Sequence, residues 1–136
     1  MIFVDTGAWL ALLNQRDQHH HDAVAVFNDL RQQRSRLLTT DYVIDETVTR
    51  VRYDTNHALS VLFLNRIELL EETGVLTIAG IDKNVFEAAK VLFRQYDSVR
   101  LSFTDCTSFV ICRVNNISEA FAFDRHFPIM GIDLRQ

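Results

Sequence analysis

Acidic residues occur at four places in the chain where an apolar segment ends or a helix begins. Asp5 follows "MIFV", Asp105 lies within "LSFTDCTSF", and Asp124 follows "EAFAF". The fourth place is "DETVT", where Asp45 and Glu46 are adjacent and helical periodicity does not choose between them. Clustered carboxylates repel one another, more strongly when buried, so such a cluster persists mainly when a cation neutralises it. Oxygen-only ligands indicate Mg²⁺ or Mn²⁺ rather than Zn²⁺, and such a site suits phosphoryl chemistry.

Each of these acids also has a local structural explanation, which for any one residue is the simpler one. An aspartate at the start of a helix accepts hydrogen bonds from free backbone N–H groups. Ser102 and Asp105 have the S-x-x-D spacing of a capping box, with Ser102 as the N-cap residue. The chemical interpretation therefore depends on whether the fold brings the four acids together.

Apolar patterning predicts strands and helices in alternation. We expect strands at 1–4, 35–40, 74–80, 119–123 and 128–132, and helices at 6–14, 21–34, 41–54 (capped by Asp41), 56–72, 82–97 and 102–116. The strands are too far apart in sequence for hairpins, which favours a mainly parallel sheet with helices on both faces, an α/β/α sandwich. The functional crevice of such a sheet lies at the carboxyl ends of its strands, where these acids fall.

Composition is that of one globular domain, residues 1–136, with 48% hydrophobic and 24% charged residues and no repeat or linker. The net charge of −4 provides no general attraction for nucleic acid, so a local patch would have to hold it. Only Lys83 and Lys90 are lysines among the 14 basic residues, and the arginines suit bidentate phosphate contacts.

Cys106 and Cys112 point to different sides of one predicted helix, so we expect no disulfide between them and a reducing compartment. The N-terminus has no basic signal region, and no apolar run approaches the roughly 20 residues of a bilayer span. We therefore expect a cytoplasmic protein with no membrane partner.

Four segments together carry a family resemblance: "FVDTGAWLALLNQRDQHHHDA", "LTTDYVIDETVT", "LSFTDCTSFVI" and "AFAFDRHFPIMGI". In this order they resemble the PIN domain family, most closely its small VapC-type toxins of toxin–antitoxin pairs. The resemblance covers essentially the whole chain. It implies an α/β/α sandwich and an endoribonuclease site in which Mg²⁺ or Mn²⁺ is held by Asp5, Glu46, Asp105 and Asp124.

The resemblance also chooses Glu46 over Asp45, because the acid that the family uses directly precedes "TVT". Thr6 resembles the family's small hydroxyl residue near the metal. One departure is Ala122, where many relatives have Ser or Thr two positions before the last aspartate. This departure puts a supporting hydrogen bond in doubt, but not the metal ligands.

Two further signals favour structure over chemistry. The histidines of "QHHHDA" point in different directions at a helix start, and the spacing of Asp17, His20 and Ala23 is one the family uses to begin a helix. Arg125 and His126 beside Asp124 offer a phosphate contact, with Arg125 as a possible supporting residue, although a surface turn is the simpler interpretation.

The predicted partners are an RNA substrate, a cognate antitoxin and a second copy of the chain. Small PIN toxins pair up, and "HALSVLFLN" is apolar nearly all round. Three alternatives remain at this stage: a PIN-type nuclease of RNA processing or DNA metabolism without antitoxin, an inactive nucleic-acid-binding module, and a phospho-acceptor domain. The last requires a lysine at the carboxyl end of a strand, whereas Lys83 and Lys90 both fall in a predicted helix.

Overall fold

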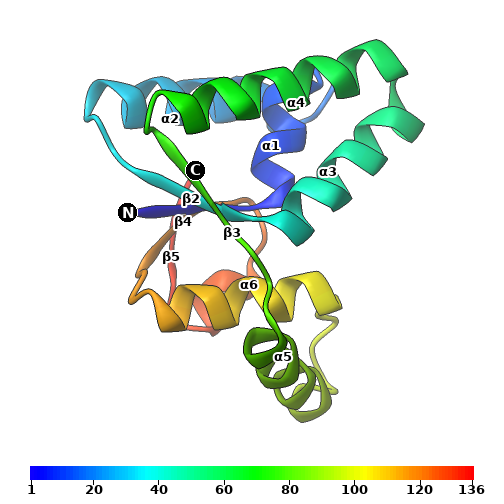
Figure 1. Ribbon diagram of the computed structural model, residues 1–136, viewed down its shortest axis with the longest axis vertical. Coiled ribbons are helices and arrows are strands. Elements are labelled where there is room, and N and C mark those ends of the chain that lie inside the picture. The colour runs from blue at the N-terminus through cyan, green and yellow to red at the C-terminus, as the bar shows by residue number, and fades with distance from the viewer.

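The computed structural model describes residues 1–136 as an α/β fold of three layers (Figure 1). A five-stranded sheet forms the middle layer. The helices α1 to α4 lie on one side of it, and α5 and α6 lie on the other. The elements are β1 (Ile2–Val4), α1 (Thr6–Leu13), α2 (His20–Gln32), β2 (Leu37–Thr40), α3 (Asp41–Asp54), α4 (His57–Glu72), β3 (Leu76–Ala79), α5 (Lys83–Gln95), α6 (Phe103–Val114), β4 (Glu119–Phe121), α7 (His126–Ile129) and β5 (Asp133–Arg135).

All neighbouring strands of the sheet are parallel, in the order β3-β2-β1-β4-β5. The chain proceeds from β1 through β2 to β3 in one direction and then returns to place β4 on the other side of β1. The carboxyl ends of β1 and β4 therefore flank the point where the strand order reverses, which is where open α/β sheets bind ligands. The Asp5 backbone N–H, directly after β1, donates to the Phe121 carbonyl at the end of β4 (3.1 Å).

The core is one cluster of 29 buried apolar residues that includes most of the sheet and the inner faces of the helices. Buried polar bonds fix α1 against the sheet. Trp9 Nε1 donates to Thr39 Oγ1 on β2 (3.4 Å), and Thr39 Oγ1 donates to the Val4 carbonyl on β1 (2.9 Å). Because buried polar groups are costly unless they are paired, these bonds define how α1 begins beside the end of β1.

The cap of α3 differs from our prediction, because the N-cap residue is Thr40 rather than Asp41. Thr40 keeps the extended backbone of β2, and its Oγ1 accepts from the Val43 N–H (3.1 Å). Asp41 is already helical, and its Oδ1 accepts from the Ile81 N–H (3.1 Å). Its carboxylate therefore links the start of α3 to the loop after β3.

The predicted strand at 128–132 is wrong. Pro128 and Ile129 lie in the short helix α7, and the last strand is β5 at Asp133–Arg135. Phe127 explains the helix, because its fully buried ring packs against Phe3 and Phe109 (centroids 6.1 and 5.0 Å apart). Proline is tolerated in a first helical turn, where its missing N–H has no partner to lose. Gly131, with φ of 78°, follows the helix where most residues would be strained.

None of the helices combines the length and the apolar character that a membrane span requires. Both cysteines are buried free thiols, in agreement with the prediction that they form no disulfide.

Candidate active site

Asp5 occupies the N-cap position of α1, but its side chain makes no capping hydrogen bond. Only 6% of the residue is exposed. The pKa of Asp5 is raised from 3.8 to about 7, mainly by burial and also by the negative charges of Asp105, Asp124 and Glu46, while the Thr6 backbone N–H partly offsets these effects. A capping role therefore does not account for this carboxylate, and the other three predicted acids lie close enough to affect its charge.

Asp105 lies in the first turn of α6 and has the predicted capping role. The Asp105 N–H donates to Ser102 Oγ and the Ser102 N–H donates to Asp105 Oδ2, both at 2.9 Å, which completes a capping box. Burial nevertheless raises the pKa of Asp105, and the charge of Asp124 adds to this, although the Ser102 hydrogen bonds oppose it. The structural and the chemical interpretations of this residue are therefore compatible, since the cap orients a carboxylate that also faces other acids.

Glu46 and Asp45, which periodicity left undecided, have different environments on α3. Asp45 is exposed, whereas Glu46 is partly buried. Burial and then the charge of Asp105 raise the pKa of Glu46, and Arg50 acts in the opposite direction from 4.0 Å. Arg50 is itself about half exposed, so solvent screens this ion pair. Of the two residues, Glu46 is therefore the one whose carboxyl group is affected by Asp105.

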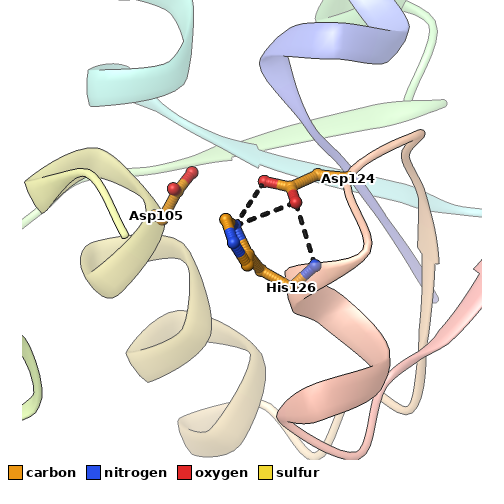
Figure 2. A group of neighbouring side chains, drawn as sticks. All are labelled: Asp105, Asp124 and His126. Carbon is orange, nitrogen blue, oxygen red and sulfur yellow. Dashed lines mark hydrogen bonds and ion pairs between the residues drawn. The ribbon is translucent and has the colours of Figure 1, made fainter. Parts of the chain in front are cut away.

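Asp124 follows β4 by three residues, because the strand ends at Phe121 rather than at the predicted residue 123. Its Oδ1 accepts from the His126 N–H (2.9 Å) at the start of α7. The His126 ring lies between Asp124 and Asp105, with Nδ1 close to both oxygens of Asp124 (Figure 2). Arg125 is exposed and makes no ion pair within the protein.

Thr6 places a hydroxyl group at the same edge of the sheet. Its Oγ1 is buried and makes no hydrogen bond of normal geometry, although it lies close enough to Glu46 to lower the pKa of that carboxyl. An unpaired buried hydroxyl is costly, so the Glu46 carboxylate or a bound ligand is needed as a partner for this atom. Ala122, the departure from the family pattern, is fully buried.

The histidine tract has the structural role that the sequence favoured. His20 Nδ1 contacts the Ala11 carbonyl (2.7 Å), which ties α2 to α1. Asp17 Oδ1 accepts from the His19 N–H (2.8 Å) just before α2 begins, and Ala23 is fully buried. The His19 ring stacks on Phe123 with centroids 4.3 Å apart.

His126 is the residue whose position the sequence did not predict, because a surface turn was the simpler interpretation of "FDRHF". Its side chain is only 26% exposed, and it contacts an acid of the cluster. The available signal was the D-x-H spacing. An aspartate that accepts from the N–H two residues later fixes that residue's backbone but not the direction of its ring, since the same turn at Asp17 leaves the His19 ring on Phe123.

Comparison with known proteins gives a consistent assignment. The family model described as PIN domain matches residues 2–132. The chain is 29% identical over 131 residues to the 23S rRNA-specific endonuclease VapC20 of Mycobacterium tuberculosis, covering 96% of this chain and 95% of that protein. It is 31% identical over 135 residues to a VapC ribonuclease of Archaeoglobus fulgidus, covering 96% of this chain and 82% of the relative.

Solved structures share the fold. The crystal structure of Mycobacterium tuberculosis VapC20, described as a Sarcin-Ricin loop cleaving toxin, aligns with a TM-score of 0.83 at 28% identity, over 97% of this chain and 96% of that one. A second crystal structure, VapBC2 from Rickettsia felis bound to a DNA fragment from their promoter, aligns with a TM-score of 0.68 at 13% identity, over 99% and 98% of the two chains. The second likeness concerns the fold alone.

Proposed function

We propose, because the chain belongs to the PIN domain family, that it is a divalent-metal-dependent endoribonuclease that hydrolyses RNA phosphodiester bonds. The observation that carries this proposal is the buried Asp5 carboxylate, which caps nothing and is affected by the charges of Asp105, Asp124 and Glu46. The names of the two relatives, an rRNA-specific endonuclease and a VapC ribonuclease, support RNA as the substrate.

The residues at this site fit a hard divalent cation. Their donors are carboxylate oxygens, which Mg²⁺ and Mn²⁺ prefer. The chain supplies little positive charge of its own there, with Arg50 at 4.0 Å from Glu46 and His126 beside Asp124. The buried Thr6 Oγ1 without a partner also fits a ligand at this place. In this proposal Asp5, Glu46, Asp105 and Asp124 hold the ion.

When bound, such an ion supplies a Lewis acid for the phosphate and lowers the pKa of a coordinated water. The chain's own contribution is to hold the carboxylates in place before substrate arrives. The capping box fixes Asp105, and the His126 N–H fixes Asp124. The exposed guanidinium of Arg125, next to Asp124, is suited to contact a phosphate of the RNA.

A cleavage assay tests this function. A mixed RNA pool that contains ribosomal RNA, incubated with Mg²⁺ or Mn²⁺, should be cut at internal sites, and excess EDTA should stop the cleavage until metal is restored. Because water and not the 2′-OH attacks the phosphorus, the cut ends should carry no 2′,3′-cyclic phosphate. Undiminished cleavage in excess EDTA would contradict the metal requirement. Cleavage of DNA in place of RNA would favour the alternative nuclease function.

A role as the toxin of a toxin–antitoxin pair is our proposal for the biological context, since the relative of known structure is described as a toxin. A small gene directly upstream that encodes a DNA-binding antitoxin, and loss of RNA cleavage when its product is added, are the expected findings. An isolated gene, with cleavage that no neighbouring product inhibits, would indicate a PIN nuclease without an antitoxin.

A homodimer is the assembly that we propose. Phe63 on α4 is buried in the core against Trp9, but Val61, Leu62 and Leu64 on the same helix are each about two-fifths exposed. Exposed apolar side chains next to one another usually mark a contact with a partner. Light scattering at micromolar concentration should give twice the 15.7 kDa chain mass, and a monomer mass would contradict the dimer.

A further inference from the structure

The His126 imidazole lies in the gap between two carboxylates of the proposed metal site (Figure 2). Its Nδ1 is 2.9 Å from Asp124 Oδ1 and 3.2 Å from Asp124 Oδ2. One possible ligand atom from each of Asp105, Asp124 and His126 lies within 4.8 Å of the other two. The ring comes from the start of α7 and Asp124 from the turn directly before it, while Asp105 comes from α6, so two segments that are distant in sequence meet at this place.

The local turn does not require an imidazole at position 126. The bond that forms the turn is made by the His126 backbone N–H with Asp124 Oδ1 (2.9 Å), and any residue except proline supplies that donor. The side chain instead turns inward and is only 26% exposed. A role in the turn therefore explains the backbone of His126, whereas its ring nitrogen makes a separate contact, a hydrogen bond or ion pair with the Asp124 carboxylate.

The spacing of these atoms agrees with neighbouring positions around one cation. In an octahedral site with bonds of about 2.1 Å, adjacent ligand atoms are about 3.0 Å apart and opposite ones about 4.2 Å apart. The Nδ1 to Oδ1 distance of 2.9 Å matches the adjacent spacing. The three possible ligand atoms all lie within 4.8 Å of one another, which is compatible with positions around one cation.

We propose that His126 supplies a nitrogen ligand, through Nδ1, to the cation held by Asp105 and Asp124. This inference rests on the proposed function, because it requires that the carboxylates bind a divalent cation. The ligand set then mixes oxygen with imidazole nitrogen, and imidazole favours transition metals, whereas Mg²⁺ prefers oxygen alone. The site accordingly selects Mn²⁺ over Mg²⁺, and His126 provides that preference.

Two substitutions separate a ligand from a residue that only positions Asp124. His126→Asn keeps a side-chain N–H close to the place of Nδ1, so it can still donate to Asp124, but an amide nitrogen has no lone pair available for a metal. His126→Ala removes both functions. The control variant is His21→Ala, which removes an exposed histidine of α2 that makes no contact with the acid cluster.

The test uses the full chain stripped of metal, loaded with Mn²⁺ and measured by pulsed electron paramagnetic resonance. The expected result is a ¹⁴N coupling of a directly bound imidazole in the wild type and in His21→Ala, and its loss in His126→Asn and His126→Ala. Calorimetric titrations should show Mn²⁺ affinity reduced about tenfold or more by His126→Asn, with a smaller change for Mg²⁺.

A Mn²⁺ spectrum of the wild type without nitrogen coupling overturns the inference and leaves the carboxylate metal site intact. Coupling that persists in His126→Asn overturns it equally, because the nitrogen then belongs to another residue. Failure of the wild type to bind Mn²⁺ at all overturns both this inference and the metal requirement of the proposed function. The wild-type spectrum alone distinguishes the first of these failures from the last, so that distinction does not depend on how well the variants fold.

Discussion

Two aspartates occupy the N-cap position of the helix that follows a strand of the same sheet, yet their side chains lie in opposite environments. Asp5 follows β1 and Asp82 follows β3, and each is the N-cap residue of the next helix, with nearly the same backbone (φ −89°, ψ 164° and φ −81°, ψ 178°). Asp82 is exposed and accepts from the Val85 N–H at 2.9 Å. Asp5 is buried and makes no capping bond.

The difference between them teaches that backbone position does not decide what an acid at a helix start does. Asp82 satisfies a free N–H of its helix, and its charge remains in water. Asp5 loses hydration, gains no cap, and lies where Asp105, Asp124 and Glu46 add their negative charge. Such an arrangement is unfavourable by itself, so a bound cation is the simplest reason for the fold to retain it.

RNA cleavage should show the largest difference between the two aspartates. Asp5→Asn keeps the shape of the side chain but removes one charge from the proposed metal site. We expect cleavage to fall by about a hundredfold or more, at least as much as is lost when a residue supporting a metal ligand is removed. Asp82→Asn, the same change at the capping position, should leave cleavage unchanged. Equal activity of the two variants in a rate measurement would make Asp5 an ordinary N-terminal acid.

The second largest difference between the two aspartates should be in how protein stability depends on pH. The pKa of Asp5 is raised to about 7 in the folded metal-free protein, against 3.8 when unfolded. The folded state therefore binds the proton more tightly, and the free energy of unfolding should fall as pH rises from about 4 to 7, by at most about 4 kcal/mol.

Urea unfolding in EDTA at several pH values measures this slope. Asp82→Asn should follow the wild type, whereas Asp5→Asn should keep only the part that comes from Glu46 and Asp105, whose pKa values are also raised. At neutral pH the metal-free Asp5→Asn protein should be at least as stable as the wild type, since each close pair of like charges costs about 1 kcal/mol or more. Parallel slopes for wild type and Asp5→Asn would show that the pKa of Asp5 is not raised in the folded protein.

The smallest effect concerns capping itself. Asp82→Ala removes the acceptor for the Val85 N–H and should lower the free energy of unfolding by about 1 kcal/mol, while Asp82→Asn should change it by only a few tenths. Thermal melts of the two variants measure this difference. If Asp82→Ala is as stable as Asp82→Asn, the cap bond contributes nothing to the free energy of unfolding. Asp82 then does not serve as a capping residue with which Asp5 can be compared.

The parallel sheet and its flanking helices could be predicted because apolar runs and helical stripes are properties of the sequence itself. The last strand could not. β5 is the polar segment Asp133–Arg135 at the sheet edge. Pro128 and Ile129 of the more apolar "PIMGI" instead lie in α7, directly after the buried Phe127. A short apolar run does not distinguish a strand from a short helix, and in this one only Ile132 is buried while Pro128 and Ile129 are exposed.

The candidate site also contains residues that the sequence could place and residues that it could not. Asp5 and Asp124 could be placed at one edge because the carboxyl ends of parallel strands meet there, whereas Asp105 lies in α6, which follows another helix and not a strand. Glu46 could be separated from Asp45 only through the family resemblance, since the two face different surroundings that helical periodicity did not resolve. The inward position of His126 depends on a side-chain turn around Asp124, which no apolar pattern encodes.

The central claim, that Asp5 belongs to a carboxylate cluster completed by a divalent cation, is tested most directly by the stabilisation that Mg²⁺ gives. Melts of wild type, Asp5→Asn and Asp82→Asn with EDTA or with Mg²⁺ provide the measurement. A ligand that binds only the folded state at a hundredfold excess over its Kd stabilises by about 2.7 kcal/mol. We predict stabilisation of this order for the wild type and Asp82→Asn, and far less for Asp5→Asn. Equal stabilisation of all three proteins, or of none, would contradict the claim.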